Sequence, residues 1–313
     1  MELFFASVGD TDIAKKYFDC TGVKINVLFS YYYIKDNVKE KIALQKDYVN
    51  KIMLDSGAFT LFGKPNEIET LNNKYRIFLE KNKQYVDETF CNTFSLDYMK
   101  SHEDFDDNHH AYLELRQLYP NIIPVVHQFI SDEDDDEIET YLLDKPNVIS
   151  IGQIESRTSE DNYPKIIASV DRIKQKCRCH LLGVTAYDVL KEVPNLDTCD
   201  SQSWLEYATK GQILFNKINS DRLFENYIVY FPRNEEFNKK GVYYKDWQYD
   251  TGDKYGDYDL FLNEIKDKLG FTLSDLTGDN VENRKICNIY YQLKMIKYIN
   301  AEQSFMNGNP SKT

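Results

Sequence analysis

Residues 180–204 read HLLGVTAYDVLKEVPNLDTCDSQSW, and this stretch decides the fold class. The apolar run 180–184 predicts a short buried strand, 186–192 has the spacing of a helix, and 196–199 predicts a second strand. A strand, a helix and a strand in this order indicate a βαβ unit, in which the two strands run parallel. The second strand is followed at once by Asp200, a charged residue at its carboxyl end.

The same alternation extends upstream over most of the chain. Further predicted strands are the apolar runs 25–33, 52–54, 93–96, 122–126 and 148–151, with 227–231 as a weaker eighth candidate. Predicted helices between them are 67–83, 109–118, 134–143 and 163–176. Repeated βα units favour a closed (β/α)8 barrel, also called a TIM barrel, with an open doubly wound sheet as the alternative. No GxGxxG sequence follows the first strand, which counts against a dinucleotide-binding sheet.

The chain divides into four predicted segments. Residues 1–232 form the barrel domain, and 233–259, rich in Asn, Lys, Gly, Asp and Tyr, is an insertion or surface loop. Helical periodicity returns after this segment, so 260–306 is expected to be a C-terminal helical appendage. The polar residues 307–313, which include Gly and Pro, are expected to be a disordered tail.

The composition indicates a soluble protein of the cytoplasm. No apolar run approaches the roughly 20 residues that cross a bilayer, and the N-terminus lacks the pattern of a signal peptide. The six cysteines are too scattered for a disulfide scaffold and are expected to be reduced. The Cys177-x-Cys179-His180 cluster is expected to serve packing, because a structural zinc site normally needs a second pair of ligands.

The net charge of −13 bears on the class of partner. An acidic protein is an unfavourable partner for nucleic acid, because phosphates are neutralised by a basic surface, although a local lysine-rich patch is compatible with an acidic chain. The most acidic run, 131–139, is expected to be a solvated loop that leads into a helix, where the helix dipole favours carboxylates.

Polar residues stand where the predicted strands end. Each of them alone is compatible with a helix cap or a turn, but their recurrence at successive strand ends favours a common site. The carboxyl ends of barrel strands meet at one face, so these side chains should converge in one pocket. Carboxylates beside amides, glycines and aromatic rings suit a flat heterocycle that both donates and accepts hydrogen bonds. The strand-end residues are Asp55-Ser56-Gly57-Ala58-Phe59, Asp97-Tyr98, His127-Gln128, Gly152-Gln153, Gly183-Val184-Thr185 and Asp200-Ser201-Gln202-Ser203-Trp204.

Several of these segments resemble the tRNA-guanine transglycosylase superfamily, and most closely its DNA-modifying branch, the 7-deazaguanine DNA transglycosylases of phages and genomic islands. Residues 53–59, MLDSGAF, look like the family's DSGGFQ turn, and Ile151-Gly152-Gln153 is similar to its glycine-rich fifth strand end. Residues 180–190, together with the Asp200 segment, resemble the family's HLLGVG…DLL stretch that leads to the nucleophile. The resemblance covers about residues 1–215.

The resemblance implies exchange of a base at a glycosidic bond. Asp200 would be the nucleophile that attacks the sugar C1′ and expels guanine, and a 7-deazaguanine (preQ0-like) base would then displace it. Asp55 would carry the proton to the leaving base and from the incoming one, as the second carboxylate of a pair. Asp97 would accept hydrogen bonds from the N1 and N2 edge of guanine, and Gln128 would donate to O6. The other base-binding residues that the resemblance implies are Ser56, Phe59, Tyr98, Gly152 and Gln153.

Two departures from the family bear on metal binding and on the nucleic acid. Nothing after Gly211 matches the family's CxCxxC…H zinc site, so neither a metal nor another cofactor is expected. Glu206 and Thr209 replace arginines that contact RNA in the tRNA enzymes, which makes DNA the expected partner and tRNA the less favoured one. Basic residues among aromatic ones suit a single strand, although the same composition also suits a plain surface loop. The residues expected to bind the nucleic acid are Ser203, Trp204, Arg233, Lys239, Lys240 and Lys245.

The leading hypothesis is a pentosyltransferase that inserts a 7-deazaguanine base into DNA, in the cytoplasm of a bacterium or a phage-infected cell, with no membrane partner. The alternatives are a tRNA-guanine transglycosylase, a glycosidase that acts on nucleosides or nucleotides, and a non-catalytic nucleobase-binding subunit. The presence of both Asp55 and Asp200 argues against a non-catalytic subunit. A homodimer is left open.

Overall fold

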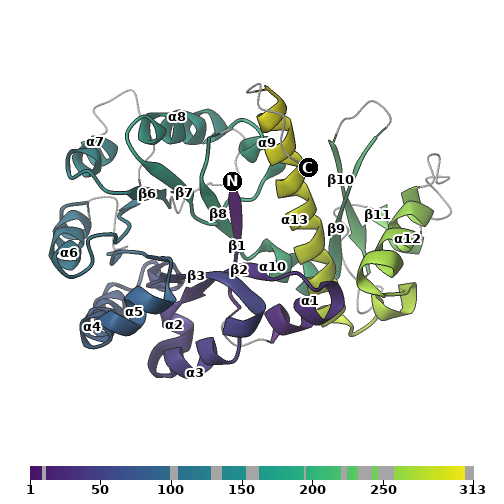
Figure 1. The fold of residues 1–313 in the computed structure, drawn as a ribbon, viewed down its shortest axis with the longest axis horizontal. Coiled ribbons are helices and arrows are strands. Elements are labelled where there is room, and N and C mark those ends of the chain that lie inside the picture. Colours follow the sequence, from purple (N-terminus) through teal and green to yellow (C-terminus); the bar gives the residue numbers. More distant parts are fainter. Residues whose placement is uncertain are drawn as a thin grey trace. The chain divides into compact units, whose positions relative to one another are not determined.

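The computed structural model describes residues 1–8, 12–98, 105–127, 136–152, 162–193, 195–219, 224–231, 242–245 and 257–306. The chain forms two compact units (Figure 1). The barrel unit comprises Met1–Thr11 and Ile25–Ser201, and the C-terminal unit comprises Asp12–Lys24 and Gln202–Thr313. The segment 12–24 therefore belongs to the C-terminal unit, although it lies between two barrel strands in the sequence.

The barrel unit contains eight parallel strands in one sheet. The strand order is β4-β3-β2-β1-β8-β7-β6-β5, so β1 lies between β2 and β8. A parallel bridge between Phe94 and Ile123 joins the two edge strands. Across this bridge Ser95 N donates to Ile123 O at 2.8 Å, and Ile123 N donates to Thr93 O at 2.9 Å. The sheet therefore closes on itself, and the predicted (β/α)8 barrel is confirmed. The strands are β1 (Glu2–Ala6), β2 (Ile25–Ser30), β3 (Val49–Asp55), β4 (Asn92–Thr93), β5 (Val125–Val126), β6 (Val148–Ile151), β7 (Arg178–Leu181) and β8 (Thr198–Ser201).

Helices follow the strands and lie around the outside of the barrel (Figure 1). Helix α8 shows why these segments are helical, because its buried residues Ile166, Val170 and Ile173 recur every three or four positions. Helix α4 begins with Pro65, whose fixed φ suits a first helical turn. The helices are α2 (Tyr31–Ile34), α3 (Val38–Ala43), α4 (Pro65–Lys81), α5 (Lys83–Thr89), α6 (Phe105–Leu118), α7 (Asp136–Leu143), α8 (Tyr163–Lys174) and α9 (Tyr187–Leu190), with 3-10 turns η1 (Lys35–Asn37), η2 (Lys46–Tyr48) and η3 (Ala58–Leu61).

Apolar side chains from several strands fill the interior of the barrel. Phe4, Leu28, Met53, Phe94 and Val148 belong to one buried cluster, and none of them is more than 5% exposed. A barrel interior that is filled in this way is a core rather than a channel. Polar chemistry must therefore lie at the ends of the strands.

The expected eighth barrel strand at 227–231 is wrong. These residues lie mainly in β10 (Phe224–Tyr230), which pairs antiparallel with β9 (Gln212–Ile218) in a separate sheet. The eighth barrel strand is β1 instead, a five-residue segment whose three central residues are buried. The barrel sheet ends at Ser201, ahead of the predicted domain boundary at 232.

The C-terminal unit combines a three-stranded sheet with helices, so the expected helical appendage is confirmed as one part of it. The sheet order is β11-β10-β9, and β11 (Val242–Tyr243) runs parallel to β10. Helix α13 contacts β9, α10, α1 and α12. Most of the predicted insertion 233–259 and all of the predicted tail 307–313 lie outside the described residues. The helices of this unit are α1 (Ile13–Thr21), α10 (Ser203–Thr209), α12 (Asp257–Leu269) and α13 (Val281–Met306), with the 3-10 turn η5 (Leu273–Asp275).

Helix α13 is buried along much of its length, and a polar side chain anchors it to its neighbours. Asn288 is fully buried, and its Nδ2 donates to Trp204 O at 3.2 Å and to Gln212 O at 3.0 Å. Asn288 Oδ1 accepts from Leu214 N at 2.8 Å, so the amide links α13 to both α10 and β9. No helix in the described part of the chain, α13 included, has the length and apolar character that a membrane crossing requires.

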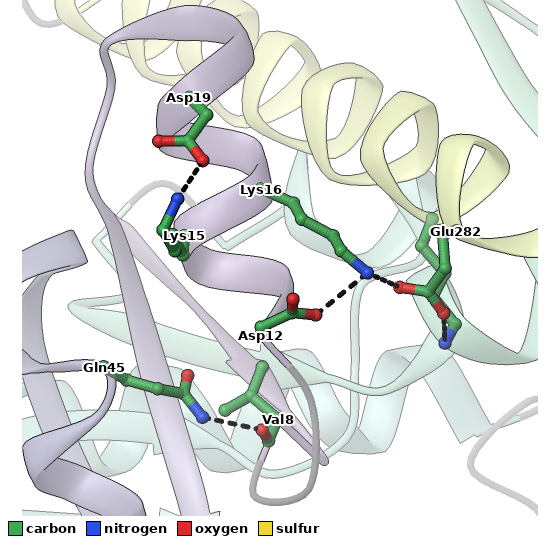
Figure 2. Close-up of polar contacts among 8 residues, drawn as sticks. Val8, Asp12, Lys15, Lys16, Asp19, Gln45 and Glu282 are labelled. Atoms are coloured by element: carbon green, nitrogen blue, oxygen red, sulfur yellow. Dashed lines mark hydrogen bonds and ion pairs between the residues drawn. The ribbon is translucent and has the colours of Figure 1, made fainter.

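Figure 2 shows polar contacts within each of the two units. In the C-terminal unit, Lys16 Nζ on α1 lies 3.0 Å from Asp12 Oδ1 and 3.4 Å from Glu282 Oε2 on α13. In the barrel unit, Gln45 Nε2 donates to Val8 O at 3.0 Å. Helix α1 is thus paired with the helices of the C-terminal unit, while the residues on either side of it pair within the barrel.

Candidate active site

Asp55 stands at the carboxyl end of β3, in a tight turn. Gly57 N donates to Asp55 Oδ2 at 2.8 Å, which orients the carboxyl group over the turn. Gly57 has a φ of +83°, and a Cβ placed on it would lie 2.2 Å from Ser30 Oγ and 2.5 Å from Tyr32 Cβ. Only glycine fits here, because the left-handed backbone and the close approach of the β2–α2 segment both exclude a side chain. The sequence Asp55-Ser56-Gly57 therefore builds a fixed support for the carboxyl group.

The pKa of Asp55 is strongly perturbed. Burial raises it most, and the negative charges of Asp97 and Asp200 raise it further, against the lowering effect of the hydrogen bond from Gly57. The resulting pKa of Asp55 is about 7. Asp55 is thus partly protonated at neutral pH, as a group that both gives and takes a proton requires. Carboxyl groups from two other strand ends therefore lie within electrostatic reach of Asp55.

Asp200 is held by a buried histidine. It is itself buried on β8, and its Oδ1 accepts from His180 Nε2 at 3.1 Å and from Gly183 N at 3.0 Å. His180 on β7 is fully buried, its Nδ1 lies 2.8 Å from Thr198 Oγ1, and its ring meets Phe94 edge-on. In the tautomer whose Nε2 carries the proton, Nε2 donates to Asp200 and Nδ1 accepts from the Thr198 hydroxyl. Both bonds fall on the same oxygen, so they fix the direction of the other oxygen, Oδ2.

His127, a predicted strand-end residue with no predicted role of its own, lies beside Asp97. His127 Nε2 is 3.2 Å from Asp97 Oδ1, and His127 Nδ1 is 3.7 Å from Glu137 Oε1 on α7. Both Glu137 oxygens also accept from His127 N, each at 3.1 Å. Burial lowers the pKa of His127, but the two carboxylates outweigh it and raise the pKa to about 10. His127 is therefore an imidazolium at neutral pH, placed between two carboxylates.

This ion pair has unused bonding capacity. Asp97 Oδ1 and both ring nitrogens of His127 are buried, and they make no well-directed hydrogen bond to any residue in the described part of the chain. Buried donors and acceptors are normally satisfied, and leaving them open costs free energy. The pair therefore suits a ligand edge that carries a hydrogen-bond donor and an acceptor side by side.

Glu137, which lies beside His127, is a buried carboxylate that the acidic composition of its segment did not predict. It belongs to the acidic run 131–139, for which a solvated surface is expected, yet its side chain is buried. On helix α7 it lies four positions before Tyr141, which is also buried, and next to buried Ile138. The helical spacing of Glu137 and Tyr141 is the signal that could have placed this carboxylate on the inner face.

The predicted base-binding residues near Asp55 differ in accessibility. Ser56 is fully buried, and its Oγ accepts from Ala58 N at 3.3 Å, so it supports the turn. Phe59 is 51% exposed and presents its ring at the surface. Gln128 and Gln153 lie outside the described residues, and their roles stay predictions.

Gly152 and Tyr98 have backbone N–H groups that are already engaged. Gly152 N donates to Val126 O at 2.8 Å within the sheet, and a Cβ on Gly152 would lie 2.8 Å from Val125 Cγ1. Tyr98 N donates to Asn108 Oδ1 at 2.6 Å. Neither N–H group is therefore available to a ligand, and the base-binding roles of Gly152 and Tyr98 stay predictions.

Ser203 and Trp204 take part in the packing of the C-terminal unit. Trp204 is fully buried, so its ring is not available to a nucleic acid, and the expected surface contact is corrected to a core position. Ser203 Oγ accepts from Gln292 Nε2 at 2.6 Å. The strand-end position of this segment suggested a binding role, but its helix instead packs against α13.

The expected basic and aromatic surface is described at only a few positions. Lys245 is exposed, and its Nζ lies 5.9 Å from the ring centre of Tyr243 and 6.0 Å from that of Tyr244. This cation–aromatic group is compatible with a binding surface, and its role stays a prediction. The residues of this surface that lie outside the described ranges are Arg233, Lys239 and Lys240.

Among the described residues, no group of three or more His, Cys, Asp and Glu side chains is arranged to hold a metal ion. The expectation that the protein uses no metal stays a prediction.

A comparison of the chain with models of known protein families gives no match, and a comparison with curated proteins gives none either.

Proposed function

We propose that the protein exchanges guanine in DNA for a 7-deazaguanine base, with Asp200 as the nucleophile and Asp55 as the acid and base. The division of labour between these two carboxyl groups carries the proposal. Asp200 is oriented by two hydrogen bonds to one oxygen, whereas Asp55 has a pKa of about 7. Glycosidic-bond exchange through a covalent intermediate uses one carboxylate as nucleophile and one carboxyl group as proton carrier. The resemblance of the sequence to the transglycosylase superfamily supports the same assignment.

The bond changes follow from these two roles. Asp200 attacks the sugar C1′ while the C1′–N9 bond breaks, and the departing guanine takes the proton of Asp55. The sugar is then esterified to Asp200, and Asp55 is a carboxylate. The incoming 7-deazaguanine attacks C1′ through N9, gives its N9 proton to Asp55 and releases Asp200 as a carboxylate. Each half-reaction restores the protonation state that the other needs, so a pKa near neutrality serves both.

Asp97 and His127 would recognise the edge of the base. Guanine and 7-deazaguanines present N1–H and N2–H donors beside the O6 acceptor. Asp97 would accept from these donors, and the imidazolium of His127 would donate to O6. In this proposal His127 takes the role that the sequence assigned to Gln128. The open bonding capacity of the buried pair is the observation that favours it.

The choice of DNA over tRNA rests on Glu206 and Thr209. Both residues lie on α10, at positions where the resemblance places arginines that contact RNA in the tRNA enzymes. An acidic and a neutral side chain cannot make the contacts to the RNA backbone that those arginines make, which counts against tRNA. The target nucleotide must in either case leave its base stack to reach the strand ends, which costs least in a single strand.

Incubation of the purified protein with an excess of a 7-deazaguanine base and with guanine-labelled DNA or tRNA tests the proposal. Label release from DNA is expected, together with a covalent protein–DNA adduct on a denaturing gel. Asp200→Asn should lower release at least about 1,000-fold, because the nucleophile is lost while the amide oxygen can still accept from His180. Release from tRNA alone would overturn the choice of DNA, and release from neither polymer would overturn the enzymatic proposal.

A further inference from the structure

A group of aromatic rings, which we call the aromatic rim, stands at the surface beside the Asp55 turn. Its members come from α2, from the η3 turn and from the residue directly after that turn, in the segments that follow β2 and β3. These two strands end side by side, because Ser30 and Asp55 are partners in the sheet register. Three of the rings are about half exposed, which is unusual for large apolar side chains on one small surface. The rim consists of Tyr32, Tyr33 (52% exposed), Phe59 (51% exposed) and Phe62 (46% exposed).

Several contacts tie the rim to the turn that carries Asp55. Tyr33 Oη lies 3.2 Å from Thr60 Oγ1, which links α2 to η3. Tyr32 N donates to Ser56 O at 3.2 Å, and Tyr32 Cβ packs into the space that Gly57 leaves by having no side chain. The rim is thus fixed to the same backbone that positions the proposed acid. Nucleotides bound on the rim would therefore lie next to the turn that carries Asp55.

The chemistry of the rim suits unpaired nucleobases. Tyr32 and Tyr33 meet edge to face with ring centres 5.0 Å apart, and Lys35 Nζ lies 4.5 Å from the centre of the Tyr32 ring. Exposed aromatic faces beside a cation form the surface on which single-stranded nucleic acids stack. A stable protein interface normally covers about 800 Å² on each partner, more than four side chains supply.

We propose that the aromatic rim stacks the unpaired nucleotides that flank the target guanine in single-stranded DNA. Lys35 contacts the phosphate backbone of the same strand. The inference rests on the proposed function for the identity of the target, and it adds that the substrate is read as a single strand. Because paired bases in a duplex are already stacked on each other, the rim has no equivalent contact with intact duplex DNA.

The test compares Tyr33→Ala/Phe62→Ala with Leu143→Ala, in which a 79% exposed apolar residue at the end of α7 is removed from the same unit. Fluorescence anisotropy measures the affinity of each protein for a labelled single-stranded oligonucleotide with one guanine, and for its duplex. The double variant should bind the single strand at least about 10-fold more weakly than the parent, and Leu143→Ala should bind it equally. Tyr33→Phe, which keeps the ring but loses the hydroxyl contact, should retain the affinity of the parent. Lys35→Gln should reduce the slope of log affinity against log salt by about 0.7.

The outcomes separate this inference from the proposed base exchange. If the parent exchanges bases but the double variant binds the single strand as tightly as the parent, the inference that the rim binds DNA is wrong and the enzymatic proposal stands. If the parent binds the single strand through these rings but releases no guanine, the enzymatic proposal is wrong and the inference that the rim binds DNA is supported. Equal affinity of the parent for duplex and single strand would overturn stacking. Loss of self-association in the double variant, with unchanged oligonucleotide affinity, would assign the rim to a second copy of this chain.

Discussion

The strand ends of the barrel unit and the Asn288 anchor of the C-terminal unit bury polar groups in different ways. At the strand ends of the barrel, burial and neighbouring carboxylates raise the pKa of Asp55 to about 7, and Asp97 and His127 keep buried atoms without a well-directed hydrogen bond to any described residue. In the C-terminal unit, the amide of Asn288 bonds to three backbone groups. Buried polar groups with complete bonding hold a fold together, whereas perturbed and incompletely bonded ones indicate chemistry or binding.

Arg284 gives the clearest case of the structural kind. Its guanidinium is almost fully buried on α13, and burial lowers its pKa from the ordinary value. Nε donates to Ala208 O at 3.2 Å, and Nη1 donates to Leu276 O at 2.7 Å and to Gly278 O at 3.0 Å. One side chain thus satisfies carbonyl groups at the end of α10 and in the turn before α13. We therefore expect substitutions in the barrel site to change activity and the pH dependence of stability, and substitution of Arg284 to lower stability.

The largest effect on stability is expected at Asp55. Its pKa is about 7 in the folded protein against an ordinary value of 3.8, so the folded state binds the proton more tightly than the unfolded chain. The stability that the proton provides is fully present below about pH 4 and is lost as the pH rises through 7, up to about 4 kcal/mol. Asp55→Asn removes this titration. Relative to the parent, the variant should therefore gain stability as the pH rises from about 4 to about 7 and level off above that, as measured by urea unfolding.

Asp188→Asn is the matched control for this prediction, because it removes an exposed carboxylate from α9. Its stability relative to the parent should change little over the same pH range. If Asp55→Asn and the parent show the same pH dependence of unfolding, the carboxyl group does not titrate near neutrality. The role of Asp55 as proton carrier would then lose its main support.

Arg284→Met should have the next largest effect. The substitution keeps much of the apolar volume but removes three hydrogen bonds. Ala208 O still accepts from Gly211 N at 3.1 Å, whereas Leu276 O and Gly278 O lose the donor that Arg284 supplies, and the loss should cost about 3 kcal/mol. Hydrogen exchange followed by mass spectrometry should show faster exchange in α13 and α10 than in the parent. Faster exchange confined to these helices would support a structural role of Arg284 within the C-terminal unit. Exchange that accelerates equally in β6 and β7 would contradict it.

Arg172→Met is the matched control for the arginine. Arg172 lies on α8 of the barrel unit, where it is about half exposed and pairs with the similarly exposed Glu139. Exposed ion pairs contribute little, so this variant should lose less than about 1 kcal/mol. A loss as large as that of Arg284→Met would show that burial of the guanidinium does not determine how much stability is lost.

Much of the barrel was predictable from the sequence, because its strands are short apolar runs separated by helical patterns. The run 148–151 coincides with β6, whose four residues are all buried. The run 25–33 was harder, because aromatic residues favour strands and yet β2 ends at Ser30. Tyr31–Ile34 form the helix α2 because Tyr32 packs onto the Gly57 turn, a contact that is distant in the sequence. Tertiary packing overrides local preference at this point.

The site was predictable in its carboxylates but not in the pairing of its histidines. Asp55, Asp97 and Asp200 follow apolar runs, so their position at strand ends is local information. The pairing of His180 with Asp200 depends instead on the register of β7 against β8, in which His180 lies opposite Thr198. No sequence pattern on either strand supplies that register. The pairing of His127 with Glu137 likewise requires a strand end and a helix face to meet.

The smallest effect is expected at the ion pairs of Lys16 in Figure 2. Lys16, Asp12 and Glu282 are all well exposed, so the pairs should contribute only about 0.5 kcal/mol, and less at high salt. Helix α1 also buries Ile13, Ala14 and Tyr17, and it contacts α12 and α13. Lys16→Ala should therefore change the free energy of unfolding by less than about 1 kcal/mol, whereas Ile13→Ala should cost about 3 kcal/mol. If Lys16→Ala were the more destabilising variant, charge rather than apolar packing would hold α1, a segment encoded between two barrel strands, in the C-terminal unit.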